Sequence, residues 1–271
     1  MRRAIQLMTA VMLALAPAPL WAWPVWIVPS DWRPKAPGPV TFTIYSQVVS
    51  GESSAPMTRD GLESAIAVDA LGRRDLLTKL PAGAQLPLRV RTAGSTVIAI
   101  RTKPVVETVP GDDFDGFLKR NFPELLKSRD GHRGEDVILT TSSLAKSVVQ
   151  VGGKATPNYF APLGESLELV PLDDPFASTE TMPTMRARAL ESALPAPGTR
   201  VVGVPLYGAN AWGPSRIYGP QIAPATGEDS WVLFPGDGGM VYRVMELKPS
   251  GDGVHFALQT ATLALRMANG R

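Results

Sequence analysis

The first hundred residues alternate apolar and other side chains over short stretches, and this period of two is typical of β-strands. Such stretches cover residues 39–49, 64–69, 86–92 and 95–103, with turn-forming residues between them. Within the last stretch, residues 96–100 are apolar enough for a strand that is buried on both faces. The spacing predicts an antiparallel β-sandwich.

One segment departs from this pattern. Between residues 112 and 128, apolar side chains recur at helical spacing, and Pro123 interrupts them. The pattern predicts two short helices, or one kinked helix, inserted into the first sandwich. Residues 143–151 fit either a helix or a strand.

The second half of the chain again has the pattern of short strands. A turn-rich stretch at residues 173–182 predicts a boundary, with a first domain over 23–176 and a smaller second domain over 177–271. Five strand candidates follow, at residues 185–190, 199–207, 230–234, 240–247 and 254–267. The chain is therefore predicted to be mainly β, with two β-sandwich domains and a short helical insertion in the first.

Composition agrees with many short strands. The chain has 26 prolines and 25 glycines, which suit turns and disfavour long helices. It has no cysteine, which excludes disulfides, thiolate metal sites and thiol nucleophiles. Hydrophobic burial must then hold the domains together.

The N-terminus has the features of a secretory signal. Arg2 and Arg3 precede a short apolar run, and small residues lead to Ala22. The run is shorter than the roughly 20 residues that span a bilayer. We expect cleavage near Ala22 and a periplasmic protein; the alternatives are a membrane anchor and cleavage near Ala18. No later segment is long and apolar enough to cross a membrane.

Charge argues against two classes of partner. Without Arg2 and Arg3, 25 basic and 25 acidic residues remain, so the exported chain would be close to neutral. Electrostatic binding to nucleic acid needs a surplus of Lys and Arg. We therefore expect no nucleic-acid binding, and no attraction to anionic membranes.

Several segments resemble a large family of uncharacterised bacterial periplasmic proteins associated with nickel or cobalt uptake. The similar segments are the predicted mature start with its first strand, at 22–45, and residues 114–118, 145–152 and 163–176. The resemblance implies a small immunoglobulin-like domain at the C-terminal end. It also implies a partner, either an inner-membrane transporter or an outer-membrane receptor.

The resemblance also indicates where a metal would be held. Relatives carry histidines just after the cleavage site, after the first strand and in a late strand. Here those places fall at Trp23, near Gln47, and near Met245 or Glu246. Ni²⁺ and Co²⁺ favour nitrogen donors, and none of these residues is an imidazole. We expect no imidazole metal site and no cofactor; the alternative is a nickel or cobalt site that uses other ligands.

Aromatic residues are a second set of candidates for ligand contacts. Trp23 and Trp26 lie close together after the predicted cleavage site, and Trp212 and Tyr218 lie in a long irregular stretch. Such rings could form a platform for an apolar or sugar ligand, or for a membrane protein partner. Packing of the early tryptophans into the first sandwich is the alternative.

Nothing in the sequence assembles a catalytic centre. The only histidines, His132 and His255, are far apart in the sequence, and no Gly-x-Ser-x-Gly motif occurs. We therefore expect a non-enzymatic periplasmic binding or accessory protein. Two alternatives remain open, a nickel- or cobalt-binding transport component and a structural envelope protein that makes protein–protein contacts.

Overall fold

The structure is a computed structural model, and it describes most of the chain between residues 24 and 266. The described ranges are 24–47, 54–83, 85–153, 155–177, 184–196, 199, 201–206, 230–233 and 239–266. The predicted signal segment, Trp23, Trp212 and Tyr218 lie outside them. Gln47 is described in its backbone only.

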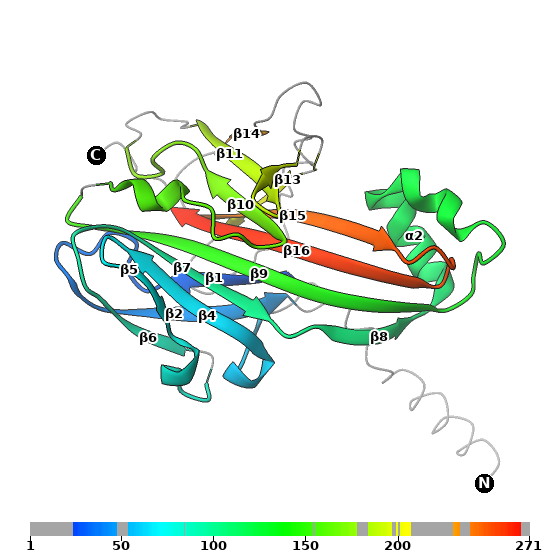
Figure 1. The fold of residues 1–271 in the computed structure, drawn as a ribbon, viewed down its shortest axis with the longest axis horizontal. Coiled ribbons are helices and arrows are strands. Elements are labelled where there is room, and N and C mark those ends of the chain that lie inside the picture. The colour runs from blue at the N-terminus through cyan, green and yellow to red at the C-terminus, as the bar shows by residue number, and fades with distance from the viewer. Residues whose placement is uncertain are drawn as a thin grey trace, which may run out of the picture.

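The described residues form a mainly β fold, as predicted, and the largest sheet runs along its length (Figure 1). Most predicted strands lie within a few residues of observed ones. In order across the large sheet, the strands are β13 (Val201–Leu206), β15 (Gly239–Pro249), β16 (His255–Arg266), β9 (Val137–Val151), β7 (Gly94–Thr102), β4 (Leu62–Asp69) and β5 (Gly72–Asp75), and β8 (Val105–Val109) pairs with the first part of β9.

Two smaller sheets complete the described strands. One contains β1 (Val25–Pro29), β2 (Gly38–Gln47), β3 (Ser54–Pro56) and β6 (Gln85–Val90). The other contains β10 (Leu167–Pro171), β11 (Thr184–Glu191), β12 (Leu194–Pro195) and β14 (Ser230–Leu233). Figure 1 shows β10 and β11 on one side of the long strands β9 and β16.

Strand β7 and the later part of β9, residues 143–151, are buried on both faces, and their alternate residues supply two different cores. Val97 and Val148 belong to one core, which also contains residues of β10, β11, β15 and β16. Ile98 and Val149 belong to the other, which also contains residues of β2 and β6. Burial on both faces explains why residues 96–100 have an unbroken apolar pattern.

Strands from both predicted domains share these sheets. β9 pairs in parallel with β16, from Ile138 opposite His255 to Ser147 opposite Ala264. β10 pairs with β11 across the predicted boundary. The division of the chain at residue 176 stays a prediction, and in the structure sheet pairing connects its two sides.

The helical insertion is confirmed. α2 (Gly111–Asn121) is followed by the 3₁₀ helix η3 (Pro123–Arg129), so Pro123 separates two helices as predicted. Phe114 of α2 packs against Phe256 of β16, with ring centroids 4.7 Å apart. Three short 3₁₀ helices lie elsewhere in the described chain, η1 (Arg59–Gly61), η2 (Leu77–Lys79) and η4 (Pro157–Phe160).

A membrane-spanning helix is not found: within the described residues, every helix is too short or too polar to cross a bilayer.

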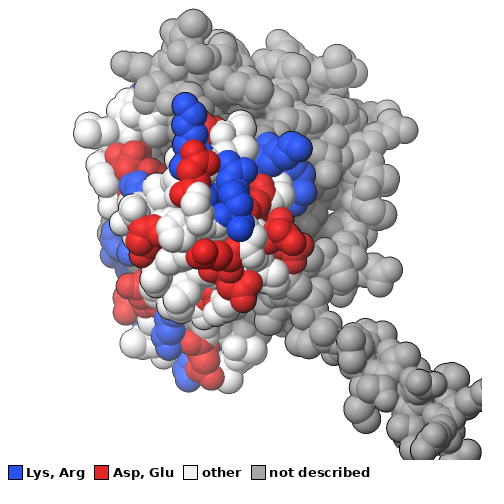
Figure 2. Space-filling view, turned by 90° about the vertical axis from the view of Figure 1, so that its right-hand side faces the viewer, with Lys and Arg blue, Asp and Glu red and all other residues white. Residues whose placement is uncertain are grey.

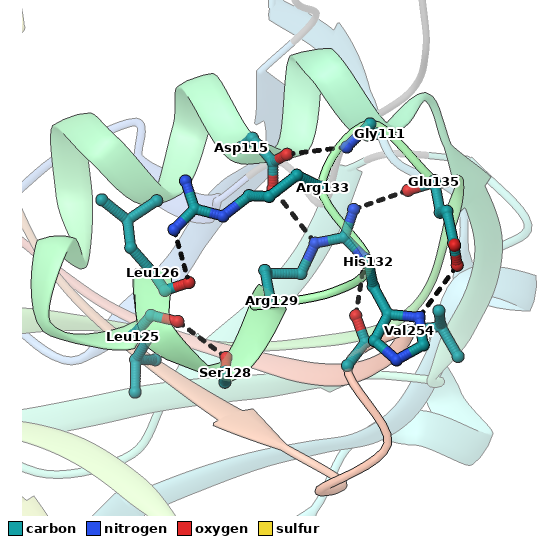
Figure 3. Close-up of polar contacts among 12 residues, drawn as sticks. Gly111, Asp115, Leu125, Leu126, Ser128, Arg129, His132, Arg133, Glu135 and Val254 are labelled. Carbon is teal, nitrogen blue, oxygen red and sulfur yellow. Dashed lines mark hydrogen bonds and ion pairs between the residues drawn. The ribbon is translucent and has the colours of Figure 1, made fainter.

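A buried arginine fastens the insertion to the large sheet (Figure 3). Arg129 donates from Nε to Asp115 Oδ1 at 3.0 Å, which joins η3 to α2. It also donates to the carbonyl oxygens of Glu135 at 2.6 Å and Gly253 at 2.5 Å. Its side chain is fully buried, and its bond to the Gly253 carbonyl forms away from water.

The surface of this end of the molecule carries both signs of charge. Figure 2 shows basic and acidic side chains interspersed on its described part. Neighbouring residues account for some of the pairs, such as Arg133 with Asp130 at 3.3 Å. Exposed pairs of this kind contribute up to about 1 kcal/mol each. The buried arginine is therefore the polar contact of most consequence here.

Replacing Arg129 should destabilise the protein strongly. Arg129→Met keeps much of the side-chain volume but leaves the Asp115 carboxylate and two carbonyls without their donor. We expect the free energy of unfolding to fall by about 3–5 kcal/mol. Urea denaturation measures this change, and Arg133→Met, at a half-exposed neighbour, should change it by less than about 0.5 kcal/mol. Equal effects of the two substitutions would contradict the conclusion that Arg129 fastens the insertion to the sheet.

Candidate functional site

A cavity lined by both polar and apolar residues lies on the face of the large sheet that also carries β10. Its volume is about 240 Å³. The side chains that matter for its chemistry come from four strands and from residues 161–166, the segment that leads into β10 and is called the strap below. They are Glu63, Arg101, Ser142, Gln259, Glu165 and Ser166.

The floor of the cavity is a row of residues in register across three strands. Ser142 of β9 is opposite Gln259 of β16, and Gln259 is opposite Glu246 of β15. Residues that face each other across paired strands project from the same face of the sheet. The row therefore places a hydroxyl, a carboxamide and a carboxylate side by side, with Glu246 one strand away from the cavity lining.

An ion pair closes one side of the cavity. Arg101 of β7 pairs with Glu165 of the strap. The Glu165 side chain is 8% exposed and that of Arg101 is 35% exposed. The carboxylate is thus almost removed from water, and the guanidinium reaches from it toward the surface.

Glu63 reaches the cavity through an irregularity in β4. The pairing of β4 with β7 shifts register between Leu62 and Ser64, so Glu63 is the extra residue of a bulge. A bulge redirects a side chain relative to the pleat of its strand. Glu63 is exposed and lines the cavity.

A second ion pair involves a residue of β10 just beyond the strap, and it also binds the strap backbone. Lys146 of β9 donates to Glu168 Oε1 at 2.5 Å, and both side chains are fully buried. Glu168 also accepts the backbone N–H of Leu163, at 2.9 Å to each oxygen. Burial lowers the pKa of Lys146, and the charge and hydrogen bond of Glu168 oppose that shift. The two acids of the strap region thus bind two bases of the sheet, and the cavity lies beside these contacts.

The structure buries Trp26, in agreement with the packing alternative for the early tryptophans. Its side chain is 1% exposed, and it stacks on Tyr45 at 5.8 Å between ring centroids with 17° between the ring planes. β1 pairs with β2 and packs against β9 and β16, so its residues are nearly all buried. Trp26 is therefore a core residue, and its ring is not available to a ligand at the surface.

Glu246 is described, and it lies beside an ammonium group. Lys248 Nζ is 3.0 Å from Glu246 Oε1 and 2.6 Å from Glu191 Oε1. Gln47 lies at the end of β2, in a different sheet, where its backbone pairs with Ser54. The structure thus separates the two described positions where the resemblance implies metal ligands.

The histidines are on the surface and each contacts its own carboxylate. His132 Nδ1 is 3.0 Å from Glu135 Oε2, and His255 Nδ1 is 2.6 Å from Asp252 Oδ2. Within the described residues, no three His, Cys, Asp or Glu side chains are grouped as a metal site would require.

The residues of the cavity were not among the predicted site residues. Arg101, Ser142 and Gln259 sit in strands with no local motif, and only long-range pairing brings them together. Glu165 and Glu168 carried a weak signal, since they are the acidic residues of the otherwise largely apolar segment 163–172.

The buried ion pair gives a testable energetic statement. Lys146→Met leaves the Glu168 carboxylate buried without its base, which should cost about 3–5 kcal/mol of the free energy of unfolding. Lys146→Met combined with Glu168→Gln removes both charges and should recover most of that loss. Urea denaturation of the single and double variants measures the difference. Equal free energies of unfolding for the single and the double variant would show that the ion pair does not hold the strap.

Comparison with known proteins yields a family but no function. Residues 20–227 match the family model described as a domain of unknown function, DUF4198, and this range includes all four segments on which the resemblance rests. No curated protein matches the chain in sequence.

A solved structure of the three N-terminal domains of the bacteriophage RB49 Highly Immunogenic Outer Capsid protein (Hoc) is similar at 13% identity, with a TM-score of 0.21. That match covers 89% of this chain and 59% of the phage chain. A likeness this weak carries no argument about fold or function.

Proposed function

Because the chain belongs to the DUF4198 family, whose function is unknown, we propose its function from its cavity: it is an exported, non-enzymatic periplasmic protein that binds a small polar solute. The observation that carries the proposal is the cavity of about 240 Å³ that contains the Arg101–Glu165 ion pair beside the row of Ser142 and Gln259. Ligand pockets commonly combine concave shape with a few placed polar groups.

The strands and ion pairs that hold the cavity in place favour a binding function. Its floor belongs to strands that are paired on both sides, and two ion pairs fasten the strap over the sheet. A site whose groups are held before the ligand arrives loses less conformational entropy on binding. The cavity is thus suited to recognise a solute without rearrangement.

The chemistry of the cavity favours binding over catalysis. Ser142 is a potential nucleophile, but nucleophilic catalysis needs a base within hydrogen-bond reach of the hydroxyl. Neither His132 nor His255 lines the cavity, and of the two carboxylates that do, Glu165 is engaged by Arg101 and no hydrogen bond joins Glu63 to Ser142 within the described residues. The cavity side chains named above can hold a ligand by charge and hydrogen bonds.

A nickel or cobalt site is the second candidate, and it rests on the resemblance. Glu246 would be its acidic ligand, but the Lys248 ammonium 3.0 Å away opposes the approach of a divalent cation. We therefore place solute binding first. A transporter of the inner membrane or a receptor of the outer membrane remains the partner that the resemblance implies.

Filling the cavity should abolish solute binding. A panel of small amines, amino acids, polyols and carboxylic acids is screened by thermal unfolding of the purified protein. A ligand at 100 times its dissociation constant adds about 2.7 kcal/mol, or several degrees in Tm. Ser142→Phe should remove the shift, whereas Thr140→Phe, two residues along the same face of β9 and outside the cavity lining, should retain it. No shift with any solute would refute the proposal.

Calorimetric titration with Ni²⁺ and Co²⁺ separates the two candidates. If the protein binds a small polar solute, as proposed, neither ion should bind with sub-micromolar affinity. Binding of that strength, lost on Glu246→Gln, would establish the metal site in its place.

Export gives an independent prediction. In a Gram-negative host, the protein carrying a C-terminal tag should be recovered from the periplasm with Trp23 as its first residue. Replacing Arg2 and Arg3 by Glu removes the basic start of the signal, so uncleaved precursor should accumulate. N-terminal sequencing of each cell fraction measures both results. Recovery of the intact chain from washed membranes would indicate an anchor.

A further inference from the structure

The charges around the cavity are unbalanced, and the imbalance extends along the sheet. Glu63 and Glu165 line the cavity together with one base, Arg101. Arg101 is paired with Glu165, and within the described chain no basic group lies within 4 Å of Glu63. The cavity therefore has one carboxylate more than it has bases.

The neighbouring polar groups add to this excess. Glu246 and Glu191 share the single ammonium of Lys248. Glu246 is directly opposite Gln259, which lines the cavity. The cavity and its margin thus contain four carboxyl groups and two bases, an excess of acidic groups. At an effective dielectric constant of about 20, charges a few ångströms apart interact by several kcal/mol, which favours a cation in this space.

Two buried oxygens at this margin point to the same chemistry. Oε2 of Glu246 and Oε1 of Gln259 are both buried, and neither accepts a hydrogen bond from the described residues. A buried acceptor that lacks a donor costs about 1–3 kcal/mol. Of the two residues, Gln259 lines the cavity, so a ligand that brings N–H donors there would relieve the cost at its oxygen, and a protonated donor would also supply positive charge.

The size of the cavity limits what can enter. Pockets that hold drug-sized ligands measure about 300–1,000 Å³. This cavity, at about 240 Å³, is smaller and suits a compound of a few heavy atoms.

From charge, donors and size together, we propose that the solute is a small compound with a protonated amine, and that its ammonium group binds between Glu63 and Glu165. This inference rests on the proposed function and specifies its ligand class. Two kinds of compound share this chemistry. A simple amine would use the carboxylates alone, whereas an amino acid would also present its carboxylate to Arg101.

Calorimetric titration of the full chain tests the inference with three probes. They are 1,4-diaminobutane, 1,4-butanediol, which has the same length with hydroxyls in place of ammonium groups, and glycine as a zwitterion. We expect the diamine or glycine to bind at least 10-fold more tightly than the diol. If glycine is preferred, Arg101 contributes to binding. If the diamine is preferred, the carboxylates suffice.

A charge variant identifies the site. Glu63→Gln keeps the shape of an exposed side chain and removes its charge, so it should weaken binding of the ammonium probe about 10-fold and leave the thermal stability of the free protein unchanged. Glu124→Gln removes another exposed carboxylate, from η3 and outside the cavity lining, and should change neither quantity. A similar loss in both variants would mean that the probe responds only to net charge, which overturns the inference.

The outcomes separate the inference from the function on which it rests. If the diol binds as well as the diamine and glycine, and Ser142→Phe abolishes its binding, the cavity binds solutes but the charge selectivity is wrong. If neither these probes nor any solute of the panel binds, both fail.

Discussion

The parallel pairing of β9 with β16 is the contact on which the rest of the described fold depends. Ten consecutive residue pairs join them, and the two members of each pair are 117 residues apart in the sequence. β16 in turn pairs with β15, and β9 with β7, so the large sheet is continuous only because of this contact. Closing a loop of that length is entropically costly, and the burial of both faces must compensate for it.

The same pairing produces the cavity. Ser142 and Gln259 are neighbours because β9 and β16 are in this register, and a shift of one strand by one residue would place a side chain of the opposite face beside the other. Arg101 enters the same space because β7 pairs with β9 on the other side. The register that builds the core therefore also determines which polar groups meet in the cavity.

The sequence predicted the local structure well and the site poorly, and the two outcomes have one cause. Alternation of apolar residues marks strands such as β2 and β11, and helical spacing with Pro123 marks the insertion, because these signals are local. Which strands pair is not local. Residues 143–151 fitted a helix or a strand because this part of β9 is buried on both faces and loses its alternation. For Trp26 the sequence leaves a ligand contact and packing both open, because nothing near it indicates that β1 is covered on both sides. The direction of the Glu63 side chain depends on a bulge, and a bulge exists only in the pairing of a strand with its partner.

Buried charge explains why the strap can lie over a partly polar cavity at all. Removing Lys146 and Glu168 from water is costly, and an apolar pair of similar volume would often be at least as stable. What the ion pair adds is position, because a salt bridge with a bound N–H is satisfied in one geometry and apolar contacts tolerate several. The Lys146–Glu168 pair holds the end of the strap, and this leaves Glu165 opposite Arg101 without any rearrangement. A chain without cysteine has no disulfide to hold a loop over its sheet, and here the two ion pairs serve that purpose.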